Sequence, residues 1–295
     1  MALWEPVGGV FTASASWLPR LSELESLGNS SFFTTVFGAL AGAYFGAWAA
    51  QKIAKRSKRA DELIKEIRSC NLGISLAIYT FEIARSLHDA VDPLRTNYQR
   101  AFKAHLDAQE KGERLTNPRY ELEGWSIVRP PVDALRKILY EDITASTNAL
   151  RAMPSLDHAV DSAITAVNTR NALLEDFRHR RFPESFGLYE MYFGMVVKGE
   201  MHRDYPDTIS HLGDASDEML FFSEVLCKEL HQHACSLREE HRAYSKDPVV
   251  IRMLKLGDKS EAYQVIIREK YSSWFEATSR VEEEMPRRWW QFWRK

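Results

Sequence analysis

The sequence predicts an all-α protein, with a single N-terminal transmembrane helix followed by a cytoplasmic antiparallel helical bundle of long, coiled-coil-like helices. Three observations lead to this fold class. Residues 26–51 carry no charge, and five basic residues follow within the next eight positions. Beyond them, apolar residues recur at intervals of three and four through most of the chain. This is the period of a helix that buries one face.

The composition is that of a folded protein with a sizeable core. The chain has 295 residues, of which 45% are hydrophobic and 27% are charged, so an intrinsically disordered chain is excluded. Basic and acidic residues are nearly balanced, 39 against 41, which leaves no global positive field for nucleic acid. The three cysteines are too few for a disulfide framework and indicate a reducing compartment.

Residues 31–51 are predicted to cross the membrane. As a helix, 20 residues rise about 30 Å, which is the thickness of the hydrocarbon core of a bilayer. Residues 1–30 then form a short non-cytoplasmic segment. The apolar stretch starts too late for a secretory signal peptide, and the extreme N-terminus lacks a basic region. The alternative interpretation is a buried helix of a soluble protein.

Charges on the two sides of this segment predict its orientation. The N-terminal side has Arg20 beside Glu23 and Glu25. The positive-inside rule places the more basic side in the cytoplasm, so we expect the N-terminus outside the inner membrane and residues 52–295 in the cytoplasm. The lipid bilayer is therefore the first expected partner. The basic residues expected at its cytoplasmic surface are Lys52, Lys55, Arg56, Lys58 and Arg59.

Small residues recur along one side of the predicted transmembrane helix. A spacing of four keeps them on a single stripe, where small side chains let two helices approach closely in lipid. The pattern predicts self-association, and hence a homo-oligomer. The alternative is that glycine and alanine are simply frequent in membrane helices. We call these residues the glycine stripe: Gly38, Gly42, Gly46 and Ala50.

Residues 52–113 are predicted to comprise the basic juxtamembrane cluster and a long helical stalk. Apolar residues from Leu63 to Phe81 step by three and four, and no proline occurs between residue 20 and Pro93. Proline removes a backbone donor and clashes with the preceding turn of a helix. We therefore expect Pro93 to kink or end the stalk, with a helical continuation to about residue 112.

Residues 114–285 are predicted to form the helical cytoplasmic body. One helix is expected to start at Pro154–Ser155, which have the character of a break and an N-cap. A second is expected between Pro206 and Pro248, and a third over residues 260–284. Each has apolar residues at helical spacing, so an antiparallel bundle is the simplest way to bury these faces.

Residues 115–131 are expected to be a long connection within the body. Asn117–Pro118 and Pro130–Pro131 break helical periodicity there, and a small hairpin is expected about Glu123–Gly124. Over residues 60–285 acidic side chains outnumber basic ones by nine. An acidic body disfavours nucleic acid as a partner.

The last ten residues, 286–295, combine aromatic rings with basic side chains and contain no acid. Aromatic rings favour the headgroup region of a bilayer, and Arg and Lys pair with anionic lipid. We therefore expect this tail to touch the inner leaflet, the alternative being that its aromatic rings pack on the body. Its membrane-surface residues are Arg287, Arg288, Trp289, Trp290, Phe292, Trp293 and Arg294.

Patterns that would predict a metal site are weak. Cysteine and histidine four residues apart on a helix can share one ion, and the candidates are Cys227, His231 and Cys235. All three cannot share one ion, because the eight residues from the first to the last rise about 12 Å in a helix. We therefore expect neither a metal nor a cofactor.

Two resemblances to enzyme families are confined to residue pairs. His88–Asp89 resembles the paired signature of the HD phosphohydrolases, but no histidine precedes it to supply their further metal ligand. The spacings of Arg100 to His105 and of Arg151 to His158 resemble that of the helical HEPN-type ribonucleases. A chain with this many arginines and histidines produces such spacings by chance.

The expected function is a membrane-anchored interaction scaffold or sensor at the inner membrane, with an unknown protein partner. One alternative is a membrane-disrupting effector of a stress or phage-defence system, assembled through the glycine stripe. A further alternative is a membrane-tethered metal-dependent hydrolase or nuclease. An enzyme is not favoured, although a catalytic site can assemble from residues that are distant in sequence.

Overall fold

The structure is a computed structural model, and it describes residues 5–7, 10–12, 31–113, 115, 118–253, 269–274 and 276. Two predicted features therefore fall outside the described residues: the tail at 286–295 and most of the helix expected over 260–284. The described side chains of α2, the first helix, begin at Gly38.

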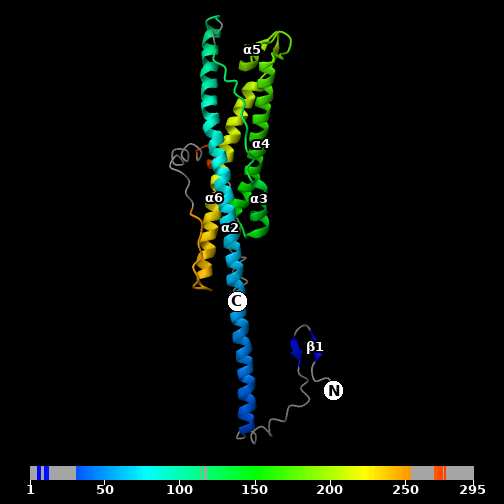
Figure 1. Ribbon diagram of the computed structural model, residues 1–295, viewed down its shortest axis with the longest axis vertical. Coiled ribbons are helices and arrows are strands. Elements are labelled where there is room, and N and C mark those ends of the chain that lie inside the picture. Colours follow the sequence, from blue (N-terminus) through cyan, green and yellow to red (C-terminus); the bar gives the residue numbers. More distant parts are fainter. Residues whose placement is uncertain are drawn as a thin grey trace. The chain divides into compact units, whose positions relative to one another are not determined.

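The prediction of an all-α fold is confirmed, because long helices form most of the described chain (Figure 1). The strands are short and pair as two antiparallel hairpins, β1 with β2 and β3 with β4. Along the chain the elements are β1 (Glu5–Val7), β2 (Val10–Thr12), α2 (Ser31–Glu110), α3 (Val132–Lys137), the π-helix η2 (Ile138–Asp142), α4 (Thr147–Arg178), α5 (Leu188–Phe193), β3 (Val196–Val197), β4 (Glu200–Met201) and α6 (Asp204–Arg242).

The chain divides into two compact units, Met1–Ala60 and Asp61–Lys295, and α2 contributes to both. In the second unit, α2 from Asp61 onward packs with α4 and α6, and α3, η2 and α5 close the bundle. Among the described side chains, no helix combines the length and the apolar character that crossing a membrane requires.

Two histidine–carboxylate contacts show that α6 runs antiparallel to α2. Near the start of the second unit, His233 of α6 lies 3.1 Å from Glu66 of α2. Farther along α2, His88 lies 3.2 Å from Asp217, which comes earlier in α6. The expected antiparallel packing is therefore confirmed for this pair of helices.

The helices α2 and α4 run in the same direction, contrary to a wholly antiparallel bundle (Figure 1). The backbone N–H of Thr144, just before α4, bonds Glu66 near the start of the second unit. The other end of α4 supplies Leu174 and Phe177 to a cluster that also contains Leu94 of α2. The reason is the non-helical segment that follows α2, which includes residues 118–131 and which we call the connector. It returns along the bundle before α4 begins.

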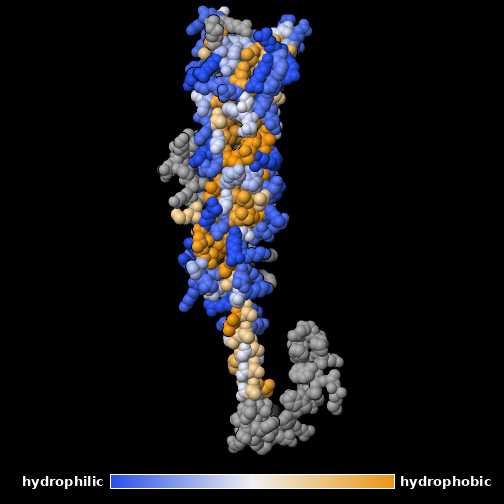
Figure 2. All heavy atoms as spheres, viewed as in Figure 1, coloured by the Kyte–Doolittle hydropathy of each residue, from blue (hydrophilic) through white to orange (hydrophobic). Residues whose placement is uncertain are grey.

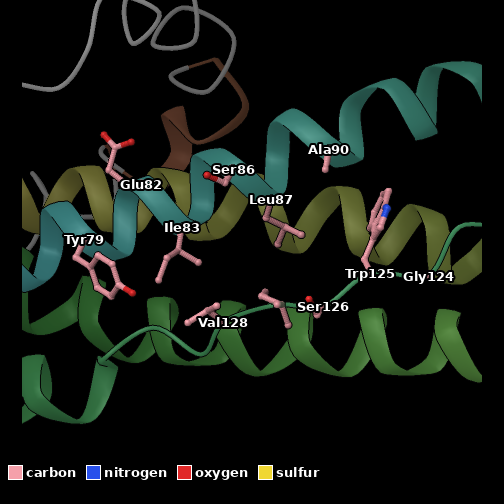
Figure 3. A pocket seen from close by; sticks show the side chains of 11 residues that line it. Tyr79, Glu82, Ile83, Ser86, Leu87, Ala90, Gly124, Trp125, Ser126 and Val128 are labelled. Atoms are coloured by element: carbon pink, nitrogen blue, oxygen red, sulfur yellow. The ribbon is translucent and has the colours of Figure 1, made fainter.

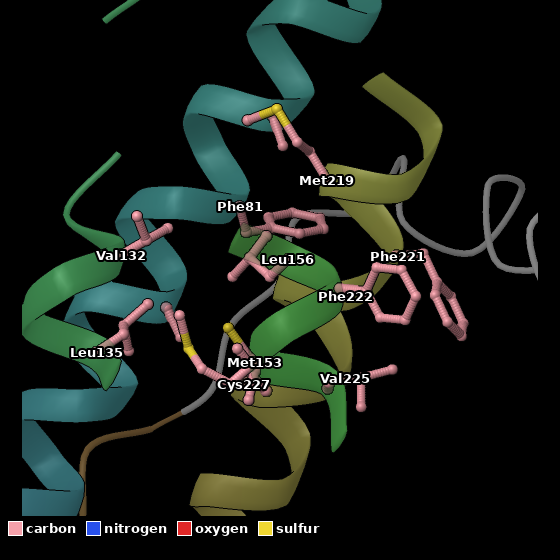
Figure 4. Close-up of a cluster of buried hydrophobic side chains, with 14 of the residues drawn as sticks. Phe81, Val132, Leu135, Met153, Leu156, Met219, Phe221, Phe222, Val225 and Cys227 are labelled. Atoms are coloured by element: carbon pink, nitrogen blue, oxygen red, sulfur yellow. The ribbon is translucent and has the colours of Figure 1, made fainter. Parts of the chain in front are cut away.

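The predicted apolar seams form the core. Figure 4 shows Phe81 of α2, Leu156 of α4 and Met219 of α6 converging in the larger of two clusters, and all three are buried. The second cluster is aromatic and lies toward the end of the bundle that holds α5. Its rings include Tyr98 and Tyr192, whose centroids are 5.6 Å apart.

The predicted start of α4 at Pro154–Ser155 is wrong, because α4 begins seven residues before the proline. Ser146 is its N-cap, and the serine hydroxyl accepts a hydrogen bond from the N–H of Ala149. Pro154 has no N–H to offer to the carbonyl of Leu150. The hydroxyl of Tyr140 donates to that carbonyl instead, at 3.4 Å, so the helix tolerates the proline.

The helix α2 continues through Pro93 to Glu110, in agreement with the expected helical continuation to about residue 112, so the proline does not end it. The expected hairpin about Glu123–Gly124 differs from the structure. No strand forms at Glu123–Gly124, where the described chain is non-helical connector. A hairpin forms instead around Lys198 and Gly199, whose positive φ values of 53° and 90° suit a two-residue turn.

Candidate functional site

The first candidate surface is the N-terminal part of α2, where residues 38–58 are exposed on every side. Large apolar side chains are uncovered there: Leu40 is 62% exposed, Tyr44 69% and Phe45 64%. The pale and orange spheres of this segment are visible in Figure 2. Water is a poor solvent for so much apolar surface.

The glycine stripe lies within this exposed segment. A Cβ added at Gly38, Gly42 or Gly46 would meet nothing within 4 Å. The stripe is therefore open to a second helix. Of the basic residues that follow, Lys52 places its ammonium group 5.1 Å from the centroid of the Trp48 ring. Of the other four, Lys55, Arg56 and Lys58 are exposed and Arg59 is half-buried.

The structure does not bring the three candidate metal ligands together. Cys227 is buried, and burial raises the pKa of its thiol to about 12, with nearby Glu224 adding to the shift. Cys235 Sγ lies 3.8 Å from Nε2 of His231. In the part of the chain that the structure describes, no three His, Cys, Asp or Glu side chains are arranged to hold a metal ion.

The residues of the pair Arg100 and His105, which resembles a catalytic signature, also lie apart. His105 is buried, with its ring stacked 5.0 Å from that of Phe193 and its Nδ1 2.6 Å from the Tyr189 hydroxyl. Burial lowers the pKa of His105, so it is a neutral core side chain at pH 7. Arg100 is exposed and bonds Asn97. Five residues along one helix place the two on different faces.

His88 and Asp89 are likewise separated. Asp89 is exposed, whereas His88 lies against Asp217 of α6. In the other HEPN-like pair, Arg151 lies over the ring of Trp274 at 5.9 Å, while His158 lines a polar groove between α4 and α6. None of these pairs forms a joint site.

A groove of about 630 Å³ lies between α2 and residues 124–128 of the connector. Figure 3 shows Tyr79, Ile83 and Leu87 of α2 facing the connector, which contributes Trp125 and Val128. Its polar lining residues include Glu82, Ser86 and Ser126. The groove is therefore apolar at its centre and polar at its margin, as in many peptide-binding surfaces.

A buried arginine holds the connector that forms one side of this groove. Arg170 of α4 is 1% exposed, and its guanidinium donates to the carbonyls of Glu123 at 2.6 Å and Glu121 at 3.2 Å. The same guanidinium lies 4.5 Å from the centroid of the Trp125 ring. Asn171 completes the attachment, because its amide bonds both the N–H and the carbonyl of Trp125.

Sequence reasoning missed Arg170. The one signal was a charged residue between Val167 and Leu174 within an otherwise apolar seam. Nothing in the sequence says that backbone carbonyls would be its partners. Beyond the attached residues, Ser126, Ile127 and Val128 form no hydrogen bond with other described groups. This side of the groove therefore presents free backbone donors and acceptors.

A second set of contacts attaches residues 269–274 to α6. Lys270 pairs with Asp214 at 3.0 Å and with Asp217 at 2.8 Å. The Tyr271 ring stacks on Phe221 with centroids 4.4 Å apart. Burial acts to raise the pKa of Asp217, but hydrogen bonds from His88 and Lys270 outweigh it and hold that pKa below its usual range. Ion pairs and aromatic stacking therefore both hold residues 269–274 against α6.

Comparison with family models, with curated proteins and with solved structures finds no match to this chain. The function is therefore inferred from the arrangement of the chain's own residues.

We expect Lys270→Gln to loosen residues 269–274. Loss of a half-exposed ion pair costs up to about 1 kcal/mol, so hydrogen exchange there should speed up about fivefold. Lys228→Gln is the matched control, because Lys228 pairs with Glu224 elsewhere on α6 and has similar exposure. Unchanged exchange in the Lys270 variant would contradict the role of this pair.

The same contact should depend on pH. The pKa of Asp217 is lower in the folded state, so its stabilising effect is complete above the unfolded value of about 3.9 and is lost as pH falls through the folded value. The pKa of Lys270 is raised in the folded state, so its effect is complete below about pH 10.4 and is lost as pH rises through the folded value. In the wild type, exchange of residues 269–274, corrected for intrinsic rates, should be slowest between these limits.

Proposed function

We propose that this protein is a membrane-tethered interaction protein, acting as a scaffold or sensor. In this proposal residues 31–51 cross the inner membrane with the N-terminus outside, and the bundle lies in the cytoplasm and binds a partner protein. One observation carries the proposal. From Gly38 to Ala50 the helix α2 is apolar and exposed on all sides, yet within the bundle it buries a regular stripe that includes Leu63, Ile67 and Ile74.

The exposed segment has the chemistry of a bilayer anchor. A helix that is apolar all round needs either a protein interior or lipid around it. Leu40, Tyr44 and Phe45 have neither among the described residues. The segment ends at a ring–cation pair, Trp48 with Lys52, and then the basic cluster, as is typical of the cytoplasmic boundary of an anchor. Residues 31–37 extend the uncharged stretch in sequence.

We expect the full chain to stay in the membrane pellet during an alkaline carbonate wash. Leu40→Lys/Phe45→Lys should release it, because each lysine near the centre of a membrane helix costs about 3 kcal/mol. Leu72→Lys/Val250→Lys is the matched control, since both side chains are exposed in the second unit. Protease should degrade the bundle only from the cytoplasmic face. Release of the wild-type chain by carbonate would contradict the anchor.

The groove between α2 and the connector is the surface that we propose for the partner. An extended peptide laid along Ser126, Ile127 and Val128 would gain backbone hydrogen bonds and bury apolar side chains against Tyr79 and Ile83. The attachment of the connector by Arg170 keeps this surface preorganised, which lowers the entropic cost of binding.

A photo-crosslinking residue at Val128 should give discrete adducts in cells. The same residue at Val250, which is exposed but not part of the groove, is the matched control. Ile83→Glu should abolish the adducts at position 128, because it places a charge in the apolar centre of the groove. Adducts that survive this substitution, or that are the same at both positions, would argue against the groove as the binding surface.

Self-association through the glycine stripe is part of the proposal. Because the positions around Gly38, Gly42 and Gly46 are open, leucine at all three should be tolerated by the helix itself while preventing the close approach of a second helix. In mild detergent we expect the wild-type oligomer to become monomeric in this triple variant. Ala39→Leu/Ala43→Leu/Ala47→Leu, on a different face, should remain oligomeric. A wild-type monomer would remove self-association.

The open stripe also favours the second candidate function, a membrane-disrupting effector assembled through these glycines. Growth arrest on expression of the wild type, relieved by the triple leucine variant, would support it. Harmless expression of an oligomeric wild type would support the scaffold. A hydrolase or nuclease gains no support from the described residues, because Arg100 and His105 lie on different faces. Contact of the tail at 286–295 with the inner leaflet remains a proposal from the sequence.

A further inference from the structure

A cavity of about 430 Å³ lies in the second unit where α6 ends. It is formed by the last turns of α6 and the chain that follows, which folds back toward α2. Asn71 of α2 holds this returning chain with two hydrogen bonds, one to the carbonyl of Val250 at 2.9 Å and one from the N–H of Arg252 at 2.8 Å. The lining includes Arg238, His241, Arg242, Ser245, Lys246 and Asp247.

Two buried nitrogens at this cavity have no hydrogen-bond partner among the described residues. His241 is 1% exposed, and its Nε2 is unpaired. The Nε of Arg238 is also buried and unpaired, and its nearest carboxylate oxygen, on Glu239, is 3.8 Å away. Leaving such groups buried and unsatisfied costs free energy. An arginine Nε–H can only donate, so Arg238 calls for an acceptor. The ring of His241 can donate to the same ligand or accept from it.

The charges of the lining specify the kind of acceptor. Arg242 is neutralised by Glu239, to which it donates at 2.8 and 2.9 Å. Asp247 accepts a hydrogen bond from the hydroxyl of Ser245. Lys246 forms no ion pair with the described residues. Asp247 keeps its negative charge, and Glu239 is shared by Arg242 and Arg238. Arg238, Arg242 and Lys246 against Glu239 and Asp247 leave one net positive charge, so the cavity favours an anion.

Stabilisation of the helix dipole is the simpler explanation for basic residues at a helix C-terminus. It accounts for their presence but not for a cavity lined by residues whose buried nitrogens are unpaired. Two of the terminal carbonyls are also satisfied: that of Glu240 accepts from the N–H of Ala243, and that of His241 accepts from the N–H groups of Tyr244 and Ser245. Their partial negative charge is thereby reduced.

We infer that this cavity binds a phosphate group, of the kind carried by the headgroup of an acidic phospholipid. Arginine and lysine donors that surround one small pocket suit the several acceptor oxygens of phosphate. The pair His233–Glu66 shows that α6 ends beside the part of α2 where the second unit begins. In the sequence, the basic cluster at residues 52–59 directly precedes this part of α2. The claim that a lipid headgroup carries this phosphate rests on the proposed membrane tether, whereas the claim that the cavity binds phosphate does not.

The test is native mass spectrometry of the full chain in a neutral detergent. The probes are dihexanoyl phosphatidic acid, dihexanoyl phosphatidylcholine and inorganic phosphate, all soluble without a bilayer. We expect one phosphatidic acid to be retained about tenfold more strongly than phosphatidylcholine. Arg238→Gln/Lys246→Gln should reduce that retention about tenfold. Arg100→Gln/Lys103→Gln removes the same charge at the other end of the bundle and should leave it unchanged.

Inorganic phosphate distinguishes the two sources. Displacement of the lipid by millimolar phosphate would assign the site to a free phosphate, and failure to displace it would assign the site to a lipid headgroup. Equal retention by the wild type and Arg238→Gln/Lys246→Gln, with unchanged thermal unfolding, would overturn the inference. So would equal retention of the two lipids. If carbonate releases the chain from membranes while phosphatidic acid still binds, only the tether is wrong.

Discussion

The buried guanidinium of Arg170 is the interaction on which the rest of the bundle depends. Removing a charge from water is costly, and here two backbone carbonyls of the connector and the face of Trp125 compensate for that cost. The carbonyl of Glu121 also accepts from the Tyr205 hydroxyl at the start of α6. A single residue of α4 is therefore linked to the connector and, through it, to α6.

This attachment explains how α2 and α4 come to lie in the same direction. Two helices in sequence pack antiparallel when a short turn joins them, and parallel packing requires a connection that returns along the bundle. The connector makes this return in non-helical form, so its backbone groups need partners from side chains. Arg170, Asn171 and Tyr205 supply several of them, and the side of the connector that they leave free forms the groove.

The sequence predicted the elements whose signal is local and repeated. Apolar spacing located the buried seams of α2, α4 and α6, including Leu63, Leu156 and Met219. The start of α4 was mispredicted because the rescue of Pro154 depends on Tyr140, a contact with η2 that propensity does not encode. The groove and the cavity at the end of α6 were not predictable, since each joins residues far apart in sequence, such as Asn71 and Val250. The glycine stripe and the basic cluster could be recognised in the sequence because each is confined to one short stretch.

Two of the three cysteine thiols are buried, so their reaction with a reagent in solution reports the opening of the bundle core. Burial raises the pKa of Cys70, as it does that of Cys227, to about 12, and thiols react with alkylating reagents as thiolates. Only the half-buried Cys235 is accessible without unfolding. Alkylation of Cys235 therefore proceeds on the native protein. Alkylation of Cys70 and Cys227 requires the core to open, so its rate depends on how often that occurs. The natural sequence therefore provides a labelling position on α6, at Cys235. The alkylation rates of Cys70 and Cys227 report how often the bundle opens.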